Sequence, residues 1–189
     1  MTAHILDQPI LAALTTRHGV HAEGGPLAMR YHPDISPLAA VSDDSEESLA
    51  ALAALIVPGD MVIVARVGEN PVPAGTVAEH VSTAAQMVAA TVSPPEHLFP
   101  FQEISDADGP EMLALAALTK PGPYARRTHE FGGYIGIRQE GRLVAMAGQR
   151  LQAPGYTEVS AVCTHPDFRG RGYGSFLLQV VAAAHTDRG

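Results

Sequence analysis

The 189-residue sequence has no tryptophan, a single cysteine, and only 5% aromatic residues. Because 46% of its residues are hydrophobic, a core must be built mainly from Ala, Val and Leu. One cysteine excludes an intrachain disulfide and fits a reducing compartment, so we expect a cytoplasmic protein. The length suits one domain of ordinary size or two small ones.

Basic residues and long apolar runs are also scarce. The chain has 12 Lys and Arg against 20 Asp and Glu, a formal net charge of -8, which argues against a general nucleic-acid binder. The longest apolar run, residues 49–57, is far too short to cross a bilayer, and residues 1–20 lack the pattern of a signal peptide. We therefore expect neither a nucleic-acid nor a membrane partner.

Residues 96–189 contain the clearest pattern, which is that of a mixed α/β fold. A helix is predicted to start at Asp108, which would cap it, with Pro110 in the first turn and Glu111 three residues after the cap. Strands are predicted at 134–138, 143–151 and 156–164; their short connections predict an antiparallel β meander. A helix with one apolar stripe follows Gly174 and should pack on this sheet.

Residues 1–95 are less regular, and Pro94-Pro95 predicts a linker between two domains, 1–95 and 96–189. Strands are predicted at 27–32, 37–41 and 61–67, with a helix that Asp44 caps and that runs to Ile56. The order strand, loop, helix therefore occurs both in 37–67 and in 156–187. This repeated order of elements predicts that the first domain is a degenerate copy of the second.

The stretch VCTHPDFRGRGYGS, residues 162–175, places glycines and arginines between a strand and a helix. The glycines let the backbone turn sharply and let a ligand approach its amides, while the helix start and the arginines supply positive charge. Such a loop suits a pyrophosphate. A P-loop would need a Lys after Gly174, and a dinucleotide fingerprint would need glycine at Ser175, so coenzyme A is the remaining class.

Residues 169–174, RGRGYG, resemble the Arg/Gln-x-x-Gly-x-Gly/Ala loop of the GNAT N-acetyltransferase superfamily, and VCTHPDF resembles the strand end before it. The resemblance covers about residues 98–189. It implies a GNAT fold and transfer of an acetyl group from acetyl-CoA to an amine by direct attack. The family usually continues with a further strand, a helix whose Tyr protonates the leaving thiolate, and two more strands. We see no counterpart of these elements, so we expect a longer chain or a second chain to complete the sheet.

The resemblance also implies roles for individual residues. Main-chain groups of Val162, Cys163 and Thr164 would bind the pantetheine arm, and a backbone amide near Val162 would stabilise the developing oxyanion. The pyrophosphate would lie on the amides of Arg169, Gly170, Arg171, Gly172, Tyr173, Gly174 and Ser175. Glu158 is the candidate base, because strand alternation places it on the same face as Val162. Arg126 and Arg127 are candidate contacts for the acceptor, a small-molecule or peptide amine.

Several alternatives remain open at this level. Glu158 could be a surface residue, and Arg126 and Arg127 could belong to a charged helix surface. A covalent acyl-enzyme on Cys163 with His165 is disfavoured, because a buried small thiol is commoner. His18 and His21 lack a third ligand, so no metal site is expected.

In the first domain, residues 42–47 occupy the position of the glycine loop, and their four carboxylates would repel a pyrophosphate. That domain would then shape the acceptor site or pair subunits, which leaves a homodimer open. The rival to an enzyme is a non-catalytic GNAT-like module that binds coenzyme A as a sensor or interaction domain.

Overall fold

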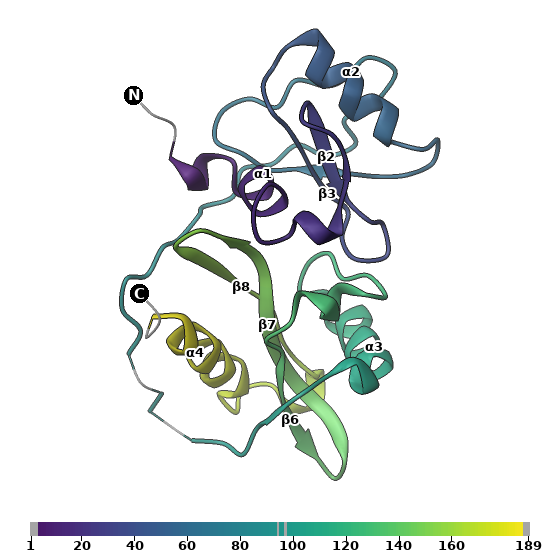
Figure 1. Cartoon of the computed structure of the whole chain (residues 1–189). Coiled ribbons are helices and arrows are strands. Elements are labelled where there is room, and N and C mark those ends of the chain that lie inside the picture. The colour runs from purple at the N-terminus through teal and green to yellow at the C-terminus, as the bar shows by residue number, and fades with distance from the viewer. Residues whose placement is uncertain (1–3, 94, 97, 187–189) are drawn as a thin grey trace. The chain divides into compact units, whose positions relative to one another are not determined.

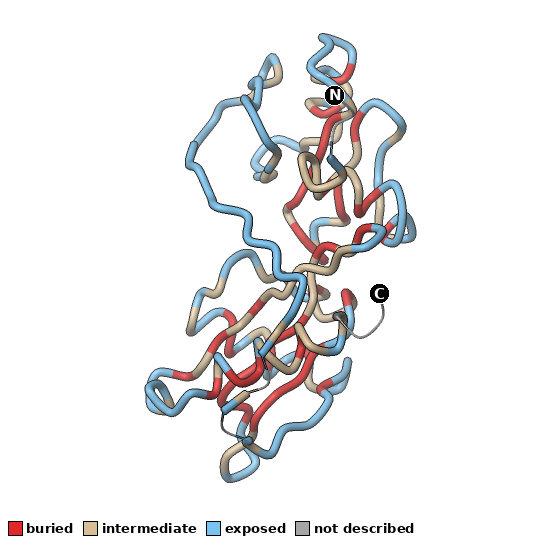
Figure 2. The backbone as a smooth tube through the Cα atoms, turned by 90° about the vertical axis from the view of Figure 1, so that its left-hand side faces the viewer, coloured by how far each residue is buried: buried red, intermediate tan, exposed pale blue. Residues whose placement is uncertain are grey.

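The computed structural model describes residues 4–93, 95–96 and 98–186, and it consists of two compact units (Figure 1). Unit 1 comprises residues 1–33, 37–87 and 151–154, and unit 2 comprises residues 34–36, 88–150 and 155–189. Figure 2 shows that each unit contains buried segments of its own. No helix among the described residues is both long and apolar enough to cross a membrane.

Unit 1 is built from two helices and a four-stranded sheet. Its elements are α1 (Pro9–Leu14), β1 (Ala22–Gly24), β2 (Ala28–Tyr31), β3 (Leu38–Val41), α2 (Glu46–Leu55) and β4 (Ile63–Val64). Strands β1, β2 and β3 are antiparallel neighbours, and β4 returns parallel to β3 after α2. The predicted strands at 27–32 and 37–41 are confirmed, whereas the strand predicted at 61–67 has only two residues.

The cap of α2 differs from the predicted one. Ser45, not Asp44, is the N-cap residue, and its hydroxyl accepts a hydrogen bond from the Ser48 amide at 3.2 Å. Asp44 instead forms an ion pair with Arg66 at 2.5 Å. The helix starts one residue later than the prediction because Ser45 has the extended backbone that a cap requires.

Unit 2 contains a second four-stranded sheet between two helices. Its elements are β5 (Gln102–Glu103), α3 (Gly109–Thr119), β6 (Ile135–Gln139), β7 (Arg142–Ala153), β8 (Tyr156–Thr164) and α4 (Tyr173–Thr186). The strand order is β5-β6-β7-β8, so β8 lies at an edge of this sheet. The three predicted strands and both predicted helices are confirmed.

The start of α3 is held by side chains, but not in the predicted way. The Asp108 carboxylate makes no capping bond to α3; it accepts from the Ser105 amide at 2.8 Å and from Arg138 at 2.6 Å. Glu111 also pairs with Arg138, at 2.6 Å, and accepts from the Leu143 amide at 3.3 Å. The carboxylates expected to cap the helix therefore attach it to the β6–β7 hairpin.

The two helices of unit 2 cover opposite faces of the sheet, as Figure 1 shows on either side of β7 and β8. The α3 face has a core that includes Met112, Leu115, Tyr134 and Met146. The α4 face has a core that includes Ile137, Val144, Phe176, Leu177 and Val181. Burial of these side chains on both faces holds β8 and the loop that follows it in place.

Candidate functional site

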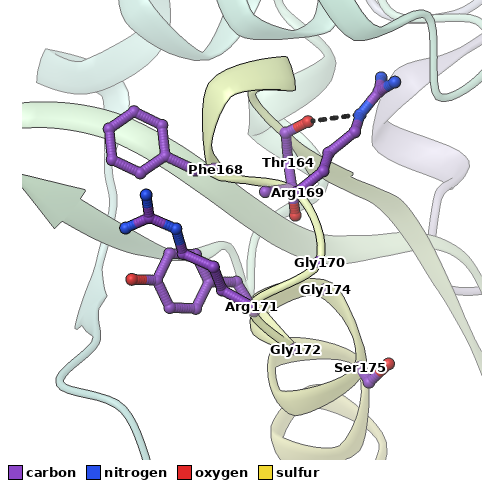
Figure 3. A pocket seen from close by; sticks show the side chains of 9 residues that line it. Thr164, Phe168, Arg169, Gly170, Arg171, Gly172, Gly174 and Ser175 are labelled. Carbon is purple, nitrogen blue, oxygen red and sulfur yellow. Dashed lines mark hydrogen bonds between the residues drawn. The ribbon is translucent and has the colours of Figure 1, made fainter.

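The loop between β8 and α4 forms a shallow pocket at the helix start (Figure 3). Its volume is about 290 Å³, and it is lined by Thr164, Phe168, Arg169, Gly170, Arg171, Gly172, Tyr173, Gly174 and Ser175. A short 3-10 helix, Pro166–Phe168, connects the strand to the glycines. Its N-cap is His165, whose Nδ1 accepts from the Asp167 amide at 3.2 Å. The structure thus brings together Thr164 and the predicted pyrophosphate-binding residues 169–175 in one concavity.

Two of the glycines are required by the backbone of this loop. Gly170 has φ of 77° and Gly172 has φ of 85°, a region that side chains disfavour. A Cβ atom on Gly170 would meet no other atom within 4 Å, which shows that the backbone there is open to an approaching ligand. Gly174 lies within the first turn of α4, and a Cβ atom there would make ordinary contacts with Thr164 and Val162.

The two arginines of the loop are exposed and point in different directions (Figure 3). The Nε of Arg169 donates to the Thr164 carbonyl at 3.4 Å, at the end of β8. The guanidinium of Arg171 lies over the Phe168 ring, 4.8 Å from its centre. Together with the N-terminus of α4, these cations give the pocket a positive potential suited to a phosphate group.

Aromatic side chains that the sequence did not single out support the loop from behind. The Phe99 ring packs edge-to-face against Tyr173 and Phe176, with centres 4.9 and 5.4 Å away. Phe101 packs against Phe176 at 5.6 Å. The only feature of the sequence that could have indicated this support is the occurrence of two aromatic residues close together, Phe99 and Phe101, in a chain with few aromatics. These contacts fix the first turn of α4, and therefore the direction in which its free amides point.

The φ of 53° at Ala161 and the loss of strict alternation around it indicate a β-bulge in β8. Val159 and Val162 both pack into the core on the α4 face, whereas Ala161 and Cys163 pack on the α3 face. The prediction that alternation places Glu158 on the same face as Val162 is therefore wrong. The bulge inserts one extra residue, so Glu158 lies on the α3 face.

Glu158 forms a bidentate ion pair with Arg150 on the neighbouring strand. Its two carboxylate oxygens accept from Nε and a terminal nitrogen of Arg150, at 2.9 and 2.6 Å. The two side chains are 36% and 24% exposed, so the pair is partly buried. In this state both oxygens of the candidate base are occupied.

The geometry agrees with comparisons to known proteins. A crystal structure of a protein from Novosphingobium aromaticivorans, assigned to the GNAT family of acetyltransferases, matches with a TM-score of 0.85 and 33% identity over 99% of this chain and 83% of that chain. The chain belongs to the GNAT family. The model of the family described as FR47-like protein matches residues 134–189. No curated protein matches the sequence.

Two other solved structures cover about half of this chain, both with a TM-score of 0.41. The ribosomal-protein-S18-alanine N-acetyltransferase from Escherichia coli has 18% identity over 48% of this chain and 61% of its own. A Mycobacterium tuberculosis protein in complex with CoA has 13% identity over 47% of this chain and 58% of its own. The match to the Novosphingobium aromaticivorans protein, together with the family model, supports acyl transfer in general as the activity of this GNAT protein.

The single cysteine of this GNAT protein is buried on the α3 face of β8. Burial raises the pKa of the Cys163 thiol above its usual value, and hydrogen bonds with Thr119 and the Met146 backbone oppose this only in part. A thiol that stays protonated is a poor nucleophile. Cys163 therefore lacks the setting of an acyl-enzyme cysteine.

The remaining predicted residues have charged or hydrogen-bonded partners. Arg126 is exposed and forms an ion pair with Asp34, while Arg127 makes bonds of 2.5 and 2.8 Å to Glu130. Nδ1 of His18 is 2.8 Å from the Tyr31 hydroxyl.

No group of three potential metal ligands was found among the described residues.

Proposed function

We propose that this GNAT protein is an N-acetyltransferase that moves an acetyl group from acetyl-CoA to a small-molecule or peptide amine. The observation that carries the proposal is the cationic glycine loop, which joins a bulged edge strand to the start of α4. A cytoplasmic location is part of the proposal, since the one cysteine of the chain is free and buried.

The loop and the edge strand offer two kinds of contact to coenzyme A. Amides of residues 169–175 would bind the pyrophosphate, helped by Arg169 and Arg171. Main-chain groups of Val162, Cys163 and Thr164 lie on the edge strand β8, where an extended pantetheine arm can add in the manner of a strand. The backbone at Val162, next to the bulge, would donate to the oxyanion that develops on the thioester carbonyl.

Acetyl transfer needs a base that takes the proton of the acceptor and a site that holds the amine against the thioester carbonyl. The acceptor arrives as an ammonium ion and must lose a proton, which we assign to the Glu158 carboxylate. The amine nitrogen then bonds to the acetyl carbon, the carbon–sulfur bond breaks, and the coenzyme A thiol and one net proton are released. Arg150 must give up at least one of its bonds to Glu158 before that carboxylate can accept the proton.

Isothermal titration with acetyl-CoA, followed by a thiol-release assay over a set of amines, tests this proposal. We expect binding of one acetyl-CoA per chain and turnover with at least one amine. Failure to bind acetyl-CoA would contradict the proposal outright.

One observation favours a second candidate, a non-catalytic module that binds coenzyme A as a sensor or interaction domain. Both oxygens of Glu158 are held by Arg150, so the structure presents no unoccupied carboxylate oxygen at the candidate base. Binding without turnover of any amine would support this candidate.

We also propose that unit 1 is a degenerate GNAT-like half that does not bind coenzyme A. Its meander β1-β2-β3, helix α2 and parallel strand β4 follow the strand, loop and helix order of unit 2. Its loop carries Asp43, whose pKa is lowered by hydrogen bonds from Ser45, so that it remains charged. A stoichiometry of two acetyl-CoA molecules per chain would contradict this.

A further inference from the structure

A buried histidine stands between the edge strand β8 and the glycine loop. His165 follows Thr164, the last residue of β8, and is only 7% exposed. Its backbone amide donates to the Val144 carbonyl of β7 at 2.8 Å, which ties this position to the sheet. Its side chain caps the short 3-10 helix Pro166–Phe168. The turn that begins the loop is therefore attached to the sheet through this one residue.

Hydrogen-bond donors face both nitrogens of the His165 ring. Nδ1 lies 3.2 Å from the Asp167 amide, and Nε2 lies 2.5 Å from a terminal nitrogen of the exposed Arg142, at the start of β7. Arginine has no acceptor, and a neutral imidazole has one acceptor nitrogen, so the ring accepts from one of the two donors at a time. The charged groups facing the ring are Arg142 and the Asp167 carboxylate, 3.6 Å from Nδ1. The ring is thus held from both ends.

The contacts of this ring continue to the pocket through Phe168. The two rings pack edge-to-face with centres 5.9 Å apart, and the Phe168 amide donates to the His165 carbonyl at 2.9 Å. The same Phe168 ring carries the Arg171 guanidinium, 4.8 Å from its centre (Figure 3). His165, Phe168 and Arg171 therefore form a continuous line of contacts from the sheet to the pocket.

The backbone of the loop needs such an anchor. Gly170 and Gly172 have positive φ and no side chain, so the backbone around Arg171 has more freedom than other residues would allow. An exposed arginine also has many rotamers, and ordering it upon binding costs conformational entropy. A side chain that is already held on an aromatic ring has less entropy to lose when a phosphate arrives.

We propose that His165 is a positioning residue for coenzyme A, which caps the turn 166–168 and, through Phe168, holds Arg171 at the phosphate pocket. The proposal rests on the function proposed above, because it concerns the cofactor of that reaction. It gives His165 a role other than that of a partner for Cys163 in covalent catalysis.

The test measures the Kd for acetyl-CoA by isothermal titration of the full chain and two variants. His165→Leu has a similar size and no acceptor, whereas the side-chain oxygen of His165→Asn can still accept from the Asp167 amide, since Asn is a good cap. Kd should rise by about tenfold in His165→Leu, the scale of a lost cap, and by about threefold in His165→Asn. His80→Leu, at an exposed histidine of unit 1, is the matched control and should bind as wild type does.

A double-mutant cycle tests the path through Phe168. Arg171→Met should raise Kd by about fivefold in the wild-type background and by less than about twofold in the His165→Leu background, because Arg171 is no longer held there. Circular dichroism and thermal unfolding verify that each variant is folded. If His165→Leu does not fold, Phe168→Leu removes the ring between His165 and Arg171 and takes its place, with the same expected rise in Kd and the same non-additivity.

Other results would contradict the proposal. A purely structural role would lower the stability of His165→Leu and leave the affinity of the folded protein at the wild-type value. An asparagine variant that binds no better than the leucine variant would show that the capping acceptor is irrelevant, and fully additive effects with Arg171→Met would show that His165 does not act through Phe168. Each of these outcomes overturns the role of His165 and leaves coenzyme A binding standing. Absence of acetyl-CoA binding by the wild-type chain would instead refute the proposed function, and this role with it.

Discussion

The hydroxyl of Tyr31 lies 2.8 Å from Nδ1 of His18, inside unit 1. His18 is 4% exposed, and burial, followed by the charge of His21, lowers its pKa from 6.5 to about 4. The folded chain therefore holds His18 neutral at a pH where the unfolded chain protonates it.

This difference predicts an acid-sensitive unit 1. Stability contributed by neutral His18 is present above pH 6.5 and is lost as the pH falls toward 4, because the unfolded state binds the proton first. The loss should be on the order of 3 kcal/mol at full extent. Urea unfolding of wild type and His18→Gln between pH 4 and 7 measures it. Identical pH dependence in both proteins would show that His18 does not titrate differently on folding.

The glycine loop predicts the loss of acetyl-CoA binding in the double variant Gly172→Asp with Arg169→Glu. The first change strains a residue at φ of 85° and adds an anion, and the second reverses a charge beside the pocket. Affinity should fall by about 100-fold or more, while the fold persists. The measurement is isothermal titration, with Arg17→Glu as the control for a reversed charge. Unchanged affinity in a folded double variant would rule out this loop as the coenzyme A site.

Direct transfer predicts that Cys163→Ala retains most activity. The thiol is buried and its pKa is raised, so it is a poor nucleophile at neutral pH. Mass spectrometry after incubation with acetyl-CoA alone should find no acetyl group on Cys163. A trapped thioester there, together with an inactive alanine variant, would replace direct attack with a covalent mechanism.

The assignment of Glu158 as base predicts that Glu158→Gln lowers kcat by about 10²-fold, the usual range for a general base. Acetyl-CoA affinity should stay close to wild type, because Glu158 precedes the backbone contacts at 162–164. A higher pH should partly rescue the variant by supplying free amine. The measurement is a pH–rate profile of both proteins. If the variant keeps the wild-type kcat across pH 6–9, Glu158 is not the base and serves only as the partner of Arg150 in the strand pair.

The bulge predicts opposite effects of two substitutions at Ala161. This residue has φ of 53°, which glycine adopts freely and a β-branched residue does not. Ala161→Gly should preserve or raise stability, whereas Ala161→Val should cost about 1–3 kcal/mol and move Glu158 relative to Val162. Thermal unfolding and kcat for both variants measure this. Equal stability of the two variants would mean that the bulge relaxes without cost.

Local patterns were sufficient for much of unit 2. Strand β8 has the bounds 156–164 that its β-branched residues and flanking turns predict, and α4 begins at Tyr173, two residues before the helix predicted after Gly174. The capping interactions were less accurate: Ser45 instead of Asp44 caps α2, and Asp108 is the N-cap residue of α3 as predicted, but its carboxylate bonds to Ser105 and Arg138 instead of to the helix amides. Capping signals compete with ion pairs that only the folded chain creates.

By itself, the sequence determined the strand–loop–helix unit, the cationic glycine loop and the class of ligand that such a loop suits. These features depend on neighbours within a few residues, through backbone freedom, periodicity and charge. Only the tertiary structure decided which face Glu158 occupies, that Arg150 holds it, and that Tyr134 is buried in one cluster with Cys163, with Tyr124 partly buried against it. Those relationships depend on a bulge and on the register between strands, where a shift of one residue moves each side chain to the other face of the sheet.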